Sequence, residues 1–104
     1  MEDQQPSSGG LSTDVVLCLA GPLLRQWPEP LALTPSRSGL AGRHRDFLRA
    51  AVALQDAGWI MYEALLVGTG PEPRALNACV TAKGRVQLME LRDAERPRAH
   101  VGQA

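Results

Sequence analysis

The stretch from Leu54 to Gly84 constrains the fold of this chain more than any other. A helical pattern ends there at Gly58, which can adopt the left-handed conformation that closes many helices. Strand-forming residues then occupy Trp59–Val67, a tip rich in glycine and proline follows, and a second apolar run spans Ala75–Val80. Thr81 can cap a new helix after that run. The order of helix, hairpin and helix predicts an α+β fold.

The N-terminal part of the chain predicts another helix. Ser12 or Thr13 can cap it, although periodicity alone fits a buried strand over Val15–Ala20 equally well. Pro22 should kink this helix or restart it. Five apolar residues exceed what one helix face can bury: Val15, Val16, Leu19, Leu23 and Leu24. We therefore expect a homodimer formed through this helix, alone or together with the last helix.

Three elements are predicted between residues 31 and 57. Leu31–Leu33 should form a short strand. Residues 34–40 should form a short helix, because a threonine cap is followed by proline at the first helical position. Arg43–Ala57 should form a longer helix, since it contains no glycine or proline and places Phe47 and Leu54 on one face.

Two short motifs resemble those of the MarR-type winged helix-turn-helix regulators. The first is Leu54 followed by Ala57-Gly58-Trp59-Ile60, and the second is Val80-Thr81-Ala82-Lys83-Gly84-Arg85. Their order and separation carry the resemblance, which covers about residues 31 to 92. The resemblance implies a winged helix-turn-helix with three to four helices and a two- or three-stranded β-hairpin wing.

The chain is long enough for one small domain. We expect the winged helix over residues 12–92. A disordered tail over residues 1–11 and a frayed tail over residues 93–104 should flank it, because both ends lack a regular apolar pattern.

Charge is distributed unevenly along the chain, although the formal net charge is zero. Five basic and two acidic residues lie from Arg25 to Arg49, whereas residues 50–73 carry three acidic residues and no basic one. A neutral total argues against a strongly electrostatic protein that binds nucleic acid without regard to sequence. It is compatible with one basic face.

The resemblance implies DNA contacts from a recognition helix over residues 43–57 in the major groove and from a wing over residues 68–74 on the backbone. Arginine near the start of such a helix can bind guanine or phosphate. The expected DNA-binding residues are Ser36 and Arg37 before the recognition helix, Arg43, His44, Arg45 and Arg49 on it, Arg74 on the wing, and Lys83 at the start of the last helix.

Two alternatives stay open. On an ordinary solvated helix face, Arg45 or Arg49 would pair with Asp46 or Glu63. Winged helices also serve as protein-binding modules. The apolar character of both faces of the strand over Trp59–Val67 favours such a module, which would bind a protein partner and no DNA.

Catalysis, metal binding and a cofactor are not predicted. The histidines are His44 and His100 and the cysteines are Cys18 and Cys79, and no two of them have the spacing of metal ligands. The N-terminus is acidic and the chain has no apolar run of membrane-spanning length, so we expect a cytoplasmic protein with free thiols. The expected function is that of a small bacterial DNA-binding transcriptional regulator that binds double-stranded DNA as a homodimer.

Overall fold

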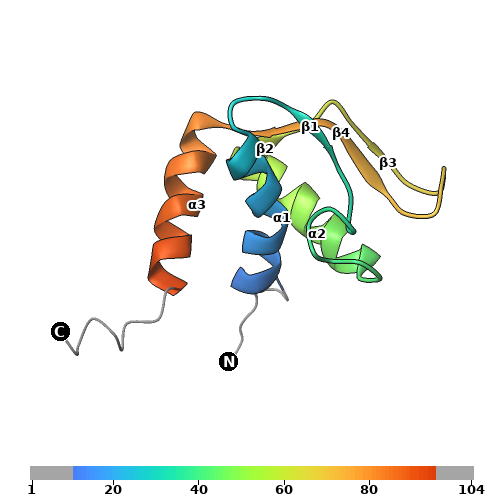
Figure 1. Cartoon of the computed structure of the whole chain (residues 1–104), viewed down its shortest axis with the longest axis horizontal. Helices are drawn as coiled ribbons and strands as arrows, with labels where there is room; N and C mark the ends of the chain where they lie inside the picture. The colour runs from blue at the N-terminus through green and yellow to red at the C-terminus, as the bar shows by residue number, and fades with distance from the viewer. Residues whose placement is uncertain (1–10, 96–104) are drawn as a thin grey trace.

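A computed structural model of the chain describes residues 11–95, which form three helices and an antiparallel sheet (Figure 1). The elements are α1 (Thr13–Gln26), β1 (Leu31–Leu33), α2 (His44–Asp56), β2 (Ile60–Met61), β3 (Ala64–Leu66), β4 (Arg74–Val80) and α3 (Ala82–Glu95). The predicted α+β class is confirmed. Most of the two predicted tails lies outside the described residues, but Leu11 packs against the core and α3 continues to Glu95.

Strand β4 is the centre of the sheet. It pairs with β1 on one side and with β2 and β3 on the other, and all these pairs are antiparallel. Figure 1 shows the three helices on one side of this sheet. The side chains of Ala75, Ala78 and Val80 are buried on the side of β4 that faces the helices. No helix of residues 11–95 covers the opposite side, which we call the outer face.

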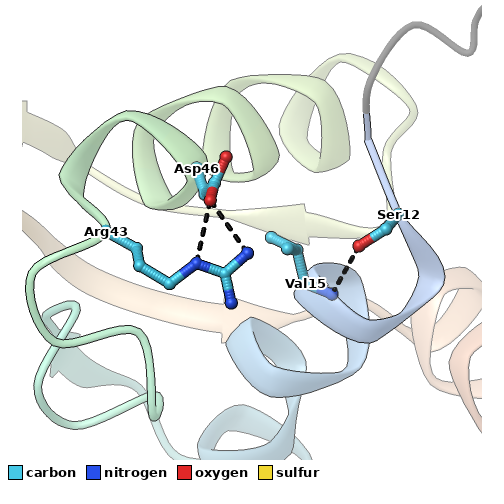
Figure 2. Close-up of polar contacts among 4 residues, drawn as sticks. All are labelled: Ser12, Val15, Arg43 and Asp46. Carbon is cyan, nitrogen blue, oxygen red and sulfur yellow. Dashed lines mark hydrogen bonds and ion pairs between the residues drawn. The ribbon is translucent and has the colours of Figure 1, made fainter.

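Helix α1 begins at a side-chain cap. The Ser12 hydroxyl oxygen accepts a hydrogen bond from the Val15 backbone N–H at 3.2 Å (Figure 2). The helix continues through Pro22 without restarting. The strand alternative for residues 15–20 is therefore wrong. A helix fits better because its buried side chains recur at helical spacing: Val15, Val16, Leu19, Ala20 and Leu23.

The burial of α1 removes the reason for placing it at a dimer interface. Of the five apolar residues that seemed too many for one chain, only Leu24 is partly exposed, and the other four are buried. They are covered because α1 packs against α2, α3 and the sheet at once. Burial within one chain therefore leaves little apolar surface on α1 to support a dimer interface, and the homodimer itself stays a prediction.

Residues 34–40 form a turn rather than the predicted helix. The Leu40 N–H donates to the Pro35 carbonyl at 2.7 Å, and the Ser38 N–H donates to the Thr34 carbonyl at 3.1 Å. Gly39 then adopts a φ of +76°, which cannot continue a right-handed helix. The buried Leu40 anchors the end of this segment, which we call the 35–39 turn.

The predicted strand over residues 59–67 is divided into β2 and β3. The register is the same on both sides of the break, with Ile60 opposite Val80 and Ala64 opposite Leu76. Asn77 on β4 has a φ of +53°, a conformation that interrupts regular pairing. Gln55 of α2 satisfies the interrupted backbone, because its side-chain oxygen accepts from the Tyr62 N–H at 2.9 Å.

The end of α2 and the start of α3 meet at what we call the α2–α3 junction. Gly58, with a φ of +79°, follows the last turn of α2. The Thr81 hydroxyl donates to the Gly58 carbonyl at 2.6 Å and accepts from the Gly84 N–H at 2.9 Å, so it also caps α3. Gly84 lies directly on the Trp59 backbone, and a Cβ at this position would overlap the Trp59 carbonyl.

Candidate nucleic-acid interface

Helix α2 presents two arginines to solvent on one stripe. Its buried side consists of Phe47, Ala50, Ala51 and Leu54. Arg45, Arg49 and Val52 are exposed on another side, at the four- and three-residue spacing that aligns side chains along a helix. Neither arginine forms an ion pair within residues 11–95. We call these three residues the α2 stripe.

Arg43 is already paired, just before the first turn of α2. Its Nε and Nη2 atoms each lie 2.9 Å from Oδ2 of Asp46, as Figure 2 shows. The solvated alternative expected Arg45 or Arg49 to hold Asp46 or Glu63. In the structure Arg43 holds Asp46, and Glu63 accepts a hydrogen bond from Asn77 at 2.7 Å. The two arginines of the α2 stripe are therefore available to a ligand, whereas Arg43 would first have to leave its carboxylate.

The Ser36 hydroxyl and N–H bind an acid of the hairpin tip. They donate to Oε1 of Glu72 at 2.9 and 3.2 Å, which joins the 35–39 turn to the tip. Ser36 is consequently less available to a phosphate than the sequence indicated. The neighbouring Arg37 is exposed, and its backbone N–H donates to the Thr34 hydroxyl at 3.1 Å.

Two other predicted contacts lie apart from the α2 stripe. Arg74 is opposite Leu66 in the hairpin and adjacent to the buried Ala75. Side chains alternate along a strand, so Arg74 belongs to the outer face, away from the helices. Lys83 lies beside Gly58 at the C-terminal end of α2, where its Nζ would be 3.9 Å from a Cβ built on that glycine. A helix rises about 1.5 Å per residue, which separates Lys83 from the first turn of α2 by most of the helix length.

His44 is half-buried at the first position of α2 and is less accessible than the neighbouring Arg45. Sequence reasoning missed Arg25, an exposed residue in the last turn of α1 that lines two grooves. One groove runs between α1 and the 35–39 turn, and the other runs between α1 and α3. The sequence places Arg25 four residues after Gly21 on the same side of the helix, which leaves room for the arginine side chain. Only the fold shows which elements pack beside Arg25.

The described part of the chain offers no metal site and no membrane span. Within residues 11–95 no group of three or more His, Cys, Asp and Glu side chains could hold a metal ion. Among the helices described, none has the length and apolar character needed to cross a bilayer.

Comparison with models of known protein families, with curated proteins and with solved structures finds no match to this chain. The geometry also explains what the two motifs of the MarR resemblance do here. Residues 57–60 and residues 80–85 meet at the α2–α3 junction, where they hold two helices together. The motifs therefore bear on the fold, and the binding chemistry must be argued from the exposed side chains.

Proposed function

We propose that this protein is a winged helix-turn-helix that binds double-stranded DNA through the α2 stripe. The observation that carries the proposal is the pair Arg45 and Arg49, which are exposed on one side of α2 and make no ion pair within residues 11–95. The order of helix, strand, turn, helix, hairpin and helix is compatible with a winged helix in which the 35–39 turn stands where the second helix is expected. We further propose a bacterial transcriptional regulator as the biological role.

The α2 stripe has the chemistry of a major-groove contact. A guanidinium can donate two hydrogen bonds to guanine or grip a phosphate, and an apolar side chain can contact the methyl group of thymine. Arg45 and Arg49 supply the first function and Val52 the second, since its side chain is 43% exposed. Arg37 in the preceding turn is the candidate for a phosphate contact that positions the helix.

The test compares arginines on different surfaces of the molecule. A preferred site is first selected from random-sequence duplexes, and binding is then measured by competition. Replacing Arg49 with alanine should remove about 1 to 3 kcal/mol of discrimination at one base position, because one bidentate contact is lost. Arg37→Ala should instead weaken binding to all sequences.

Lys83→Ala is the control, because it removes one positive charge from the start of α3, which most of the length of α2 separates from the first turn of that helix. Its affinity should stay close to that of the wild type if the α2 stripe enters the groove. The absence of a retarded complex between wild-type protein and any duplex at low salt would disprove DNA binding.

A second candidate function is protein interaction through the outer face. Its apolar residues include Met61, which is 55% exposed, and the half-buried Leu66, Leu76 and Cys79. A groove of about 300 Å³ on this face lies between Met61 and Cys79. Uncovered apolar residues gathered on one sheet face are typical of an interface.

The partner that this face fits best is a second copy of the chain. Glu63 lies among the apolar residues, between Met61 and Leu66, and Arg74 is opposite Leu66 at one end of them, so this face carries one exposed acid and one exposed base. A two-fold axis that sets two such strands antiparallel brings each acid toward the base of the other copy. This arrangement preserves the expected homodimer but moves its interface from α1 to the sheet.

A further inference from the structure

Two arginines face one groove between α1 and the 35–39 turn. The groove has a volume of about 440 Å³, and Arg25 of α1 and Arg37 of the turn line it together with two serines. Within the described part of the chain no carboxylate lines it. Arg25 and Arg37 thus line one cleft from two elements, and the nearest carboxylate among the contacts of its lining residues is that of Glu72, which Ser36 already holds.

A second groove, of about 220 Å³, runs between α1 and α3 and adds two more arginines. Arg85 and Arg92 line it from α3, and Arg25 lines it from α1. Residues 85, 89 and 92 of α3 follow the four- and three-residue spacing of one helix side. None of the described residues along this groove is acidic either. Arg25 borders both grooves, so the four arginines form one continuous surface, which we call the arginine belt.

Local contacts hold two members of the arginine belt in place. The guanidinium carbon of Arg85 lies 5.5 Å from the centre of the Trp27 ring, within the range of a cation–π interaction. Gly21 lies one turn before Arg25, and a Cβ on it would be 3.4 Å from the Arg25 Nη1 atom. The Arg25 side chain therefore lies back along α1, over a position that has no side chain of its own.

We infer that the arginine belt binds phosphate groups of a nucleic-acid backbone, on a surface distinct from the α2 stripe. Like charges that line one surface repel one another, and a bound phosphate reduces this repulsion. Guanidinium groups also match phosphate oxygens geometrically, which makes arginine suited to a backbone contact. None of Arg45, Arg49 and Val52 lines either groove, and Arg37 is the one belt residue that the proposed function also uses.

This inference rests on the proposed function for its ligand, and the test separates the two. Arg25→Gln and the double variant Arg25→Gln, Arg85→Gln keep polar side chains at exposed positions. The single variant should melt at the wild-type temperature, and the double variant, which also loses the Arg85–Trp27 contact, should melt only slightly lower. Affinity for a duplex of random sequence is measured over a series of salt concentrations. We expect the slope of log affinity against log salt to fall by about one for each arginine removed.

The preferred base sequence should not change in these variants, because a backbone contact carries no base information. Lys83→Gln, which removes one positive charge from an exposed residue that lines neither groove, is the control and should leave the slope unchanged. Wild-type slope and affinity in the double variant would overturn the belt while leaving DNA binding through α2 intact.

If the wild-type protein binds no duplex, the proposed function fails and the belt is judged with a small anion. Inorganic pyrophosphate is titrated into labelled protein while the arginine Nε–H signals are followed by NMR. Shifts confined to Arg25, Arg37, Arg85 and Arg92 would support a phosphate site of different biological origin. No shift at these residues would overturn the belt.

Discussion

At the scale of single residues, the pKa of the Tyr62 phenol reports on the break between β2 and β3. Partial burial raises its pKa above the ordinary value of 10.0, and the carboxylate of Asp56 raises it further. Tyr62 is the only tyrosine of the chain, so the ultraviolet absorbance of tyrosinate measures this group alone.

We expect Tyr62 to ionise at higher pH in the folded protein than in the urea-unfolded chain. The stability contributed by the neutral phenol is fully present below pH 10.0 and is lost as the pH rises through the raised value. Asp56→Asn should lower the folded pKa in part, because burial is the larger cause and remains. Identical titration curves for folded and unfolded protein would show that Tyr62 is as solvated as a free side chain.

The sequence identified several site residues by type but not their partners. Arg45 and Arg49 were expected on an exposed side of a helix, and the structure has them there, because helical periodicity separates them from Phe47. The pairing of Arg43 with Asp46 was missed even though the two are local neighbours, since Arg45 and Arg49 also lie within three residues of that acid in sequence. The Ser36–Glu72 contact joins distant residues, and no local pattern indicates it.

At the scale of elements, the α2–α3 junction depends on the absence of a side chain at Gly84. This residue lies in the first turn of α3, where alanine would ordinarily favour a helix by about 1 kcal/mol over glycine. Here a methyl group must displace the Trp59 carbonyl, which is backbone and cannot rotate away. We expect Gly84→Ala to destabilise the protein by about 1 to 3 kcal/mol.

Thermal unfolding followed by circular dichroism measures the change in melting temperature. A lower melting temperature in Gly84→Ala than in the wild type would support the close contact with Trp59. Gly70→Ala is the control, because no atom lies within 4 Å of its Cβ position and its φ is not positive. A melting temperature that rises in Gly84→Ala would mean that α3 does not approach Trp59 closely.

Elements with a strong apolar period were predictable and those set by single backbone conformations were not. Phe47, Ala51 and Leu54 define α2 because each is buried, and the predicted and observed bounds differ by one residue at each end. The helix over residues 34–40 failed because Gly39 takes a left-handed conformation after one turn. The hairpin strand was divided because Asn77, on the opposite strand, also takes a left-handed conformation. The strand-forming residues over 59–67 carry no information about the conformation of the strand that pairs with them.

At the scale of the whole molecule, the net charge of zero conceals a separation of surfaces. The arginine belt lies on α1, α3 and the 35–39 turn, whereas the acid Glu63 lies between β2 and β3 of the hairpin. Segment charges along the sequence indicated uneven charge, but the convergence of Arg25 with Arg85 depends on the packing of α1 against α3. Nothing in the local sequence specifies that packing.

A homodimer through the outer face makes a prediction for the intact protein. Sedimentation should show a dimer that Met61→Glu converts to a monomer, because a charge would be buried among Leu66, Leu76 and Cys79 of two copies. Val52→Glu is the control, since it places the same charge on a valine of α2 that is 43% exposed and should leave the dimer intact. A wild-type protein that stays monomeric at every concentration reached would rule out this interface.

The central place of β4 in the sheet determines when that sheet can form. Each of β1, β2 and β3 pairs with β4, and β4 is the last strand within residues 11–95. During synthesis, the first three strands therefore have no partner until residues 74–80 have been made. Helices α1 and α2 can pack against each other earlier, but their common apolar side stays uncovered in the growing chain. Termination before residue 74 would thus release a chain with no sheet, and the cell would treat it as a substrate for chaperones or proteases.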